Sequence, residues 1–411
     1  MSAWKKSLVA LACSSVLFLT GCNDDDKNNV SNTYSTYISQ SPYSQDSLSA
    51  ASRIDVMKYN MPNVQGKTIT SSALVLTPKM PQPKDGWRVV VWKQGTVGSG
   101  DQCAPSKNHL HPDFKVLAEV LLDAGYVIVA PDYEGLGEKG IHPYLHSKSA
   151  ANTAIYAQKA YQERYAGQAQ GAWMSVGHSQ GGHASLAIAE YAQTDPNYLG
   201  AVAAAPASSL GFIIKYVAPE LLNTVLLGES LGVLPAGTAA AGYADLLSFA
   251  AYVTTGIQVY DPDFDYKTVF ESRSQPIVDA ALGTTGDNGL CLDELREIFA
   301  EDILQYVAEN PGKTVLDYPA LIQNFDENPE IAEFLATNQP ATRYIAKPVM
   351  IVQGTSDAAV PYEVTQQLAA QLTAYGTQVE WQDVEGGGHS NVISLSKQQI
   401  LEFIQLHMPA R

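Results

Sequence analysis

A serine between glycines offers the first chemistry in this sequence, in the motif Gly177-His178-Ser179-Gln180-Gly181. The apolar run 172–176 before it is typical of a short buried strand, and residues 183–191 after it have the pattern of a helix. A strand, a tight turn and a helix in this order form a nucleophile elbow, which exposes a reactive hydroxyl. Gly177 and Gly181 fit this turn because the strand and helix backbones pass close together there. We therefore predict that Ser179 is a nucleophile.

A serine hydroxyl needs a general base within hydrogen-bond reach, and the base needs an acid that fixes its tautomer. Asp357 follows the buried run 347–354, and His389 follows a run of glycines just after the last expected strand, 378–384. Both positions are loops after strands, where parallel sheets place their active sites. We predict a triad of Ser179, Asp357 and His389. Asp383 is the alternative acid, although it lies too close to His389 in sequence for the usual arrangement.

The remaining histidines are interpreted structurally. We expect His178 and His183 to be packing residues, because neighbours on a tight turn point in different directions. Surface or loop positions are expected for His109, His111, His142 and His146. No group of side chains has the spacing of metal ligands, so we expect neither a metal nor a cofactor.

Strands and helices alternate along most of the chain, which predicts a doubly wound, mostly parallel sheet with right-handed crossovers. The segments 54–59 and 68–76 read as an antiparallel opening pair. Further strands are expected at 87–92, 126–130, 172–176, 201–205, 347–354 and 378–384, with helices at 114–122, 149–166, 183–191 and 397–407.

The alternation stops between 207 and 340, where the pattern is helical and shows no clear strand. Its first part, 210–260, is strongly apolar. A transmembrane helix is disfavoured there because Pro219, Pro235 and several glycines interrupt every long run. A plain helical core and a lid that lines an acyl pocket remain equally open.

The N-terminus has the features of a targeting segment. Lys5 and Lys6 precede the apolar run 8–19, which is too short to span a bilayer. The run ends in Leu19-Thr20-Gly21-Cys22, which resembles the lipobox of bacterial lipoproteins. We predict a signal peptide over 1–21, a lipidated Cys22 that holds the protein in the bacterial cell envelope, and a flexible polar tether over 22–50. An ordinary cleaved signal peptide is the alternative.

Composition excludes some partners. The net charge is −17 over 411 residues, which argues against nucleic acid as a ligand. With Cys13 removed and Cys22 lipidated, Cys103 and Cys291 remain as an even pair in an oxidising compartment, where we expect a disulfide rather than two free thiols. The sequence gives no oligomeric state, and a monomer is the default.

Together the motifs resemble the secretory-lipase branch of the α/β-hydrolase superfamily over about residues 53–411. The motifs are Gly-His-Ser-Gln-Gly-Gly at 177–182, Ala-Pro-Asp-Tyr-x-Gly-Leu-Gly at 130–137, Gln-Gly-Thr at 94–96 and Gly-x-x-Asp-x-x-Val-Pro at 354–361. The resemblance implies an α/β-hydrolase core in 51–206 and 341–411, with a helical cap, 207–340, inserted after the sixth strand. Some members tie the loop after the oxyanion strand to the cap by a disulfide, which fits Cys103 with Cys291.

The resemblance also implies the two donors of an oxyanion hole. One is the N–H of Gln180, which follows the nucleophile, and the other lies in the loop after the third strand, where we assign Thr96. Lys93-Gln94 stands where His-Gly is common in the superfamily.

The expected activity is hydrolysis of a small-molecule or lipid carboxylic ester through an acyl-enzyme. A peptidase or a thioesterase is an alternative on the same fold, because fold alone does not decide the substrate. A non-catalytic lipoprotein that binds a partner through the cap is the alternative of another class, and a complete Ser, Asp, His set in the expected order weighs against it.

Overall fold

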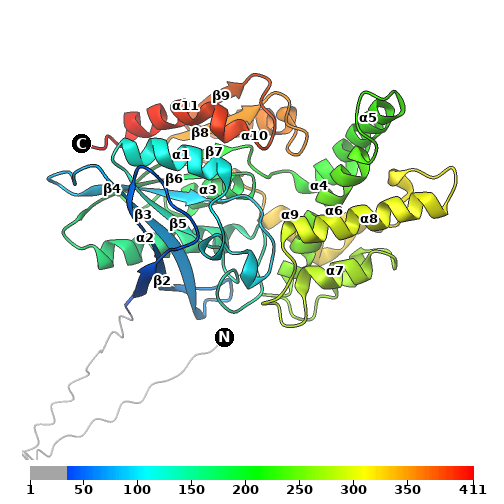
Figure 1. The fold of residues 1–411 in the computed structure, drawn as a ribbon, viewed down its shortest axis with the longest axis horizontal. Coiled ribbons are helices and arrows are strands. Elements are labelled where there is room, and N and C mark those ends of the chain that lie inside the picture. Colours follow the sequence, from blue (N-terminus) through cyan, green and yellow to red (C-terminus); the bar gives the residue numbers. More distant parts are fainter. Residues whose placement is uncertain (1–34) are drawn as a thin grey trace, which may run out of the picture. The chain divides into compact units, whose positions relative to one another are not determined.

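An open twisted sheet organises the part of the chain that this computed structural model describes, residues 35–411 (Figure 1). It has nine strands in the order β1-β2-β3-β5-β4-β6-β7-β8-β9. The pairs β1–β2, β2–β3 and β3–β5 are antiparallel. Every neighbouring pair from β5 to β9 in the sheet order is parallel. The strands are β1 Tyr37–Pro42, β2 Ala51–Pro62, β3 Thr68–Pro78, β4 Trp87–Lys93, β5 Val127–Pro131, β6 Ala169–His178, β7 Tyr198–Ala204, β8 Val349–Gly354 and β9 Val379–Val384.

Strand β1 corrects the prediction of a flexible tether over 22–50. Residues 37–42 pair antiparallel with β2, and the N–H groups of Thr36 and Tyr37 donate to the Glu163 carboxylate at 2.8 and 3.1 Å. Tyr43 and Leu48, which follow the strand, are buried in the core. The tether prediction is therefore wrong from residue 36 onward. The predicted signal peptide and Cys22 lie outside the described residues.

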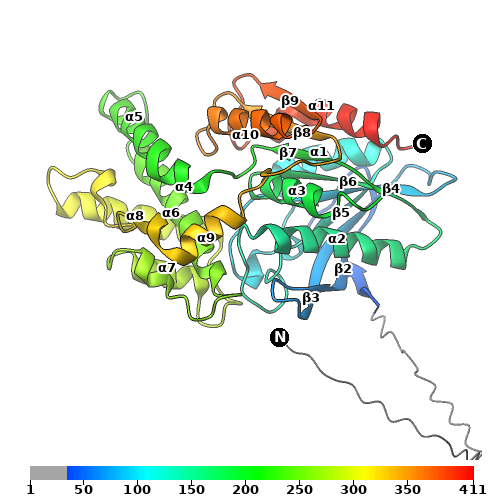
Figure 2. The same ribbon diagram turned by 180° about the vertical axis from the view of Figure 1, so that it is seen from behind.

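Helices cover both faces of the sheet (Figures 1 and 2). Alternate residues of β4 show the division, because Val90 and Trp92 join one apolar cluster while Val89 and Val91 join another. A strand that is buried on both faces reads as a continuous apolar run, as this one does. One face packs against α1 Pro112–Asp123 and α11 Val392–His407; the other packs against α2 Ser147–Arg164, α3 Gln180–Tyr191 and α10 Tyr362–Ala374.

The predicted cap is helical and lies between β7 and β8, which are neighbours in the sheet. It follows the seventh strand rather than the sixth, because β1 was not predicted. Its own core is formed by residues such as Leu247, Val278 and Phe299, which are almost completely buried. Its helices are α4 Leu210–Phe212, α5 Ala218–Ser230, α6 Thr238–Ile257, α7 Gln275–Leu282, α8 Leu292–Glu309 and α9 Pro329–Thr337.

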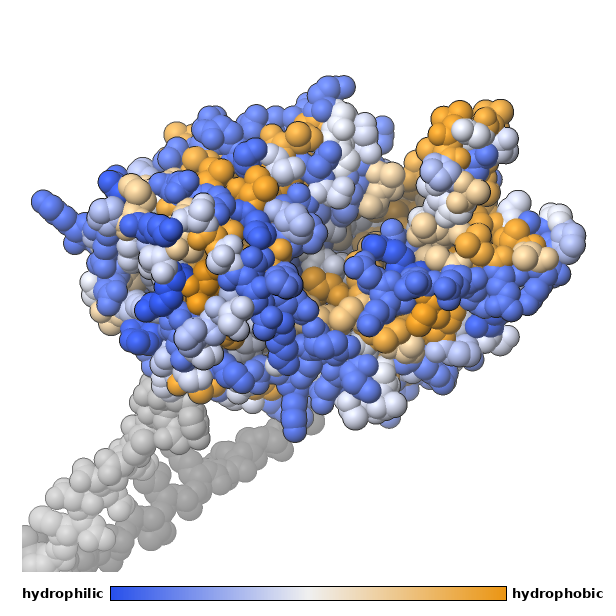
Figure 3. Space-filling view, in the orientation of Figure 1, coloured by the Kyte–Doolittle hydropathy of each residue, from blue (hydrophilic) through white to orange (hydrophobic). Residues whose placement is uncertain are grey.

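The cap carries an apolar arm, the helical run Leu210–Ser230, which a π-helical turn at Ile213–Val217 makes continuous. Among the described residues, this run is long and apolar enough to cross a membrane, with a mean hydropathy of 1.4, and 17% of it is buried. Pro219 does not interrupt the run, because the π-helical turn leads directly into α5, where Pro219 is the second residue. Figure 3 shows apolar surface gathered on this arm. The apolar stretch is thus helical core in α6 and exposed surface in α5.

Candidate active site

Ser179 lies on a sharp turn between β6 and α3. Its φ of 58° is in the left-handed region, which a residue other than glycine adopts only when its surroundings enforce it. A Cβ on Gly177 would lie 2.0 Å from the Gly181 carbonyl oxygen, and one on Gly181 would lie 1.9 Å from the Lys93 carbonyl oxygen. Only glycine fits at either position. The Ser179 hydroxyl makes no capping hydrogen bond to α3.

The structure brings Asp357 and His389 together. The Nδ1 atom of His389 lies 2.9 Å from Oδ2 of Asp357. The Asp357 side chain is fully buried, and its Oδ1 accepts the N–H groups of Ala359 and Val360 at 2.9 Å each. The loops after β8 and β9 touch here, since a Cβ on Gly354 would lie 2.3 Å from the carbonyl oxygen of Gly387.

The charge on Asp357 fixes the orientation of His389. Burial tends to raise the pKa of Asp357, but the hydrogen bond and charge of His389, with the N–H groups of Val360 and Ala359, hold that pKa below its usual range. The ionised carboxylate keeps the His389 proton on Nδ1, which leaves Nε2 able to accept a proton. The alternative acid, Asp383, instead accepts from Tyr362 and Trp381 at 2.7 and 2.8 Å.

The other histidines differ in their burial and their contacts. His178 packs its ring 4.7 Å from the His389 ring, and His183 is buried against the Asn338 carbonyl at 2.8 Å, so both are packing residues as predicted. His109 and His111 are exposed at the rim of the cavity described below. His146 is partly buried and accepts from the Ser149 N–H at the start of α2.

His142 occupies a loop, one of the two expected positions, but its burial was not predicted. Burial lowers its pKa to about 3, so the ring is neutral. Its Nδ1 donates to the Glu134 carbonyl at 2.9 Å, and its Nε2 accepts from the side-chain amide of Gln180 at 3.0 Å. Local sequence could not predict this contact, because the two partners are 38 residues apart.

Of the two predicted oxyanion donors, Gln180 follows Ser179 in the chain and Thr96 lines the same cavity as Ser179. The loop Gln94–Thr96 follows β4 and lies against the elbow, since a Cβ on Gly95 would be 3.7 Å from the Ser179 Cβ. The N–H of Gln180 belongs to the first residue of α3, which has no acceptor within its own helix. The side chain of Thr96 shares a hydrogen bond of 2.6 Å with the Tyr144 hydroxyl.

A cavity of about 570 Å³ opens beside Ser179 and His389. Its apolar wall comes mainly from the sheet domain, through Leu74, Trp92, Leu110, Phe114 and Ala130. The cap contributes Asp245, Phe249, Leu292 and Arg296. Of the apolar stretch 210–260, only α6 therefore lines the cavity, so the open alternative of a pocket-lining lid applies to α6 alone.

Residues 108–400 match the sequence model of the alpha/beta hydrolase family. The chain belongs to this family. Among curated proteins, none matches the hydrolase in sequence.

Solved structures share the fold of this hydrolase. The rice cell wall degrading esterase LipA from Xanthomonas oryzae is 19% identical with a TM-score of 0.65, and the match covers 92% of this chain and 99% of that one. Candida antarctica lipase A in its closed state is 16% identical with a TM-score of 0.64, over 91% and 82% of the two chains. A putative hydrolase from Legionella pneumophila is 19% identical with a TM-score of 0.64, over 87% and 90%.

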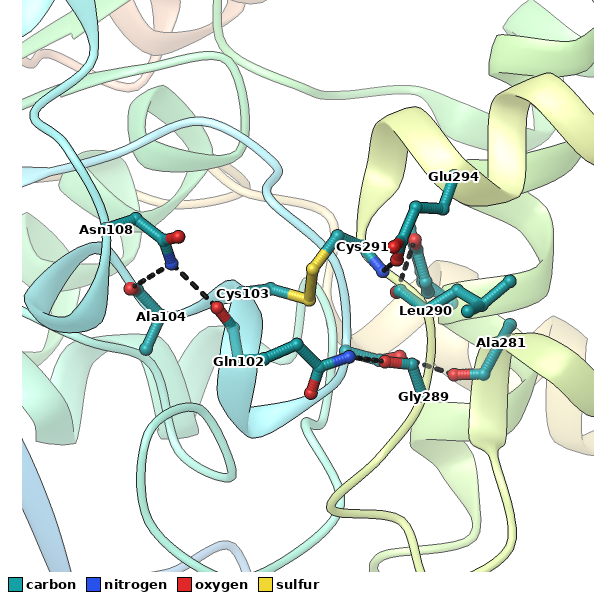
Figure 4. The surroundings of a disulfide bond; sticks show 11 residues. Gln102, Cys103, Ala104, Asn108, Ala281, Gly289, Leu290, Cys291 and Glu294 are labelled. Carbon is teal, nitrogen blue, oxygen red and sulfur yellow. Dashed lines mark hydrogen bonds between the residues drawn. A yellow bond between two sulfur atoms is a disulfide. The ribbon is translucent and has the colours of Figure 1, made fainter.

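The cap of the hydrolase is joined to the loop that follows β4. The structure pairs Cys103 with Cys291 in a disulfide, with Cα atoms 5.4 Å apart (Figure 4). Gly98 forms an antiparallel bridge with Cys291, and the Leu292 N–H donates to the Val97 carbonyl at 2.9 Å. The loop that contains Thr96 is therefore connected to the start of α8 by backbone hydrogen bonding and by the disulfide.

Proposed function

We propose that this hydrolase cleaves carboxylic esters through an acyl-enzyme, with Ser179 as nucleophile, His389 as base and Asp357 as its orienting acid. The observation that carries the proposal is His389 fixed by a buried, ionised carboxylate in the same cavity as a serine on a strained elbow. A serine becomes nucleophilic when such a base can take its proton.

In the proposed reaction, Nε2 of His389 takes the Ser179 proton as the serine oxygen bonds to the ester carbonyl carbon. The N–H groups of Thr96 and Gln180 donate to the oxyanion that forms. Collapse of this tetrahedral intermediate breaks the bond between the carbonyl carbon and the alcohol oxygen. The alcohol leaves with the proton from His389. Water then attacks the acyl-enzyme by the same steps, with His389 again as base, and releases the acid and free Ser179. Asp357 stabilises the imidazolium in both halves.

The cavity favours an ester with an apolar acyl group. The wall of Leu74, Trp92 and Phe114 would bury such a group, at roughly 0.8 kcal/mol per buried methylene. The cavity volume is in the range of small-molecule sites. The names of two similar structures, an esterase and a lipase, support the same reaction class.

The test is hydrolysis of nitrophenyl esters from acetyl to palmitoyl by wild type, Ser179→Ala and Ser390→Ala. Ser179→Ala should keep its fold and lose roughly 10⁴-fold in turnover. Ser390→Ala removes the other serine that lines the cavity and should stay near wild type. Turnover that survives in Ser179→Ala would refute the mechanism. A peak at short chains would indicate a small-ester esterase, and one at long chains a lipase. Wild type that cleaves only thioesters or peptides would refute the ester assignment.

A further inference from the structure

Three buried rings make hydrogen bonds to residues in and next to the predicted oxyanion hole, and none of the three lines the cavity. Tyr133, His142 and Tyr144, which are 2%, 3% and 3% exposed, all come from the segment between β5 and α2. The Tyr133 and His142 ring centroids are 5.3 Å apart, and those of His142 and Tyr144 are 5.9 Å apart. The rings therefore form one packed cluster, which we call the ring cluster.

The polar atom of each ring ends on a different part of the hole. The Tyr133 hydroxyl donates to the Gln94 carbonyl at 2.8 Å. His142 accepts from the Gln180 side chain, and the hydroxyls of Tyr144 and Thr96 share one hydrogen bond. The ring cluster thus holds the loop on one side of Ser179 and the first residue of α3 on the other.

These contacts constrain backbone as well as side chains. A peptide is planar and trans, so turning the Gln94 carbonyl toward Tyr133 points the Gly95 N–H the opposite way. Fixing the Thr96 hydroxyl restricts the rotation of that residue about its Cα–Cβ bond. The Tyr133 ring itself packs against the buried Lys93, whose Nζ lies 3.7 Å from the ring centroid.

We propose that Tyr133 and Tyr144 are positioning residues, which hold the Gln94–Thr96 loop so that the Thr96 N–H meets the transition-state oxyanion. This inference rests on the proposed function. Donors fixed before reaction stabilise developing charge without reorganising, so a loop that can drift loses transition-state binding more than substrate binding.

The test compares Tyr133→Phe and Tyr144→Phe with Tyr126→Phe. Each change removes one hydroxyl and keeps the ring. Tyr126 is the matched control, because it is buried and its hydroxyl donates to the Met408 carbonyl at 2.6 Å, far along the chain from the elbow. All three variants should lose a similar, small amount of thermal stability.

The two site variants should lose roughly 10- to 100-fold in kcat with little change in KM. Their affinity for a boronic acid, which mimics the tetrahedral intermediate on Ser179, should fall by the same factor. Tyr126→Phe should keep both wild-type values. In a Thr96→Val background, Tyr144→Phe should add nothing, because its partner hydroxyl is already absent.

Site variants that match Tyr126→Phe in kcat and boronate affinity would overturn the proposal. So would an equal loss in all three variants, which would mean a purely structural effect. Failure of the proposed function would show separately. In that case boronate binding would survive the Ser179→Ala substitution.

Discussion

Asp357 and Glu134 are both buried carboxyls, yet their surroundings shift their pKa values in opposite directions. Asp357 has a partner base and several N–H donors, which outweigh the effect of burial. Glu134 has only the Ser149 hydroxyl and the Val64 N–H, so burial dominates and raises its pKa to about 7. Hydrogen-bond donors and the charge of His389 therefore hold the pKa of Asp357 down, whereas two donors do not offset the burial of Glu134.

Glu134 gives a prediction for the pH dependence of stability. Its folded pKa of about 7 exceeds the ordinary 4.5, so between these values the folded state keeps a proton that the unfolded state releases. Stability should therefore fall as pH rises through this window, by about 3 kcal/mol in total. In Glu134→Gln the amide oxygen can accept from the Val64 N–H and the amide N–H can donate to the Ser149 hydroxyl, while the titration is removed. The free energy of unfolding of this variant relative to wild type should therefore rise from pH 4.5 to 7 and then level off.

Urea unfolding at a series of pH values measures this difference. Glu385→Gln, at an exposed position, is the control for the loss of one carboxylate from the chain. A difference for Glu134→Gln that does not change with pH would mean that the buried carboxyl does not hold its proton.

The sequence predicted some of these residues better than others. Ser179 and Asp357 each follow a strongly apolar strand, and His389 follows the last expected strand and a run of glycines. Local pattern therefore located these residues, and the parallel sheet brought them together. Tyr133 and Tyr144 contact Gln94 and Thr96, which lie 39 and 48 residues away in the chain. No periodicity connects residues at such separations, so their contacts could be found only from the fold.

At the level of elements, the elbow depends on how closely α3 approaches β4. A Cβ on Gly181 would meet the Lys93 carbonyl oxygen at 1.9 Å, and neither backbone can move aside without separating the elbow from the oxyanion loop. The glycine at this position is therefore required by the contact between two elements.

Gly181→Ala should consequently lower the melting temperature and reduce ester turnover at least about 100-fold, because a shift of 1 Å in a site can cost that much. Gly242→Ala in α6 is the matched control, since its nearest neighbour would be Leu222 at 3.7 Å. An alanine in a helix interior should stabilise by about 0.5–1 kcal/mol and leave turnover unchanged. Wild-type turnover in Gly181→Ala would contradict the close approach seen here.

Elements with strong apolar runs were predictable, and those with polar sequences were not. Strands β2 to β9 and the helices α1, α2, α3 and α11 follow the predicted pattern, because burial on one or both faces requires it. Helix α10, which also packs on the sheet, was not predicted. Strand β1 was not predicted, because most of its side chains are exposed and its stabilisation comes from backbone pairing with β2. In the cap, helicity was predictable, but which helix reaches the cavity depends on packing between helices that local sequence does not encode.

At the scale of the whole molecule, an acidic body carries one apolar projection. The net charge is −17, whereas the arm around α5 exposes Phe212, Leu227, Leu231 and Val233. Soluble monomers rarely expose large contiguous apolar patches, so this arm is unusual surface. The predicted anchor at Cys22 would add a second apolar element to the same chain.

We propose that Cys22 carries the lipid that holds the hydrolase in the bacterial envelope. Metabolic labelling with an alkyne fatty acid should mark wild type and Cys13→Ser, whose cysteine lies in the predicted signal peptide, but not Cys22→Ser. The thiol of Cys22 is the proposed attachment atom, so its loss should remove the label completely. Equal labelling of Cys22→Ser would exclude lipidation at this residue.

The bridge between Gly98 and Cys291 has a consequence for recombination among relatives. Because β7 and β8 are adjacent, the sheet alone would allow the insertion between them to be exchanged as a cassette without changing strand register. The segment 97–103 belongs to that cassette as well, through its strand bridge and disulfide to α8. A chimera that imports a foreign cap should therefore import the matching loop with it. Crossover points that separate the two would break a single structural unit encoded in two distant parts of the gene.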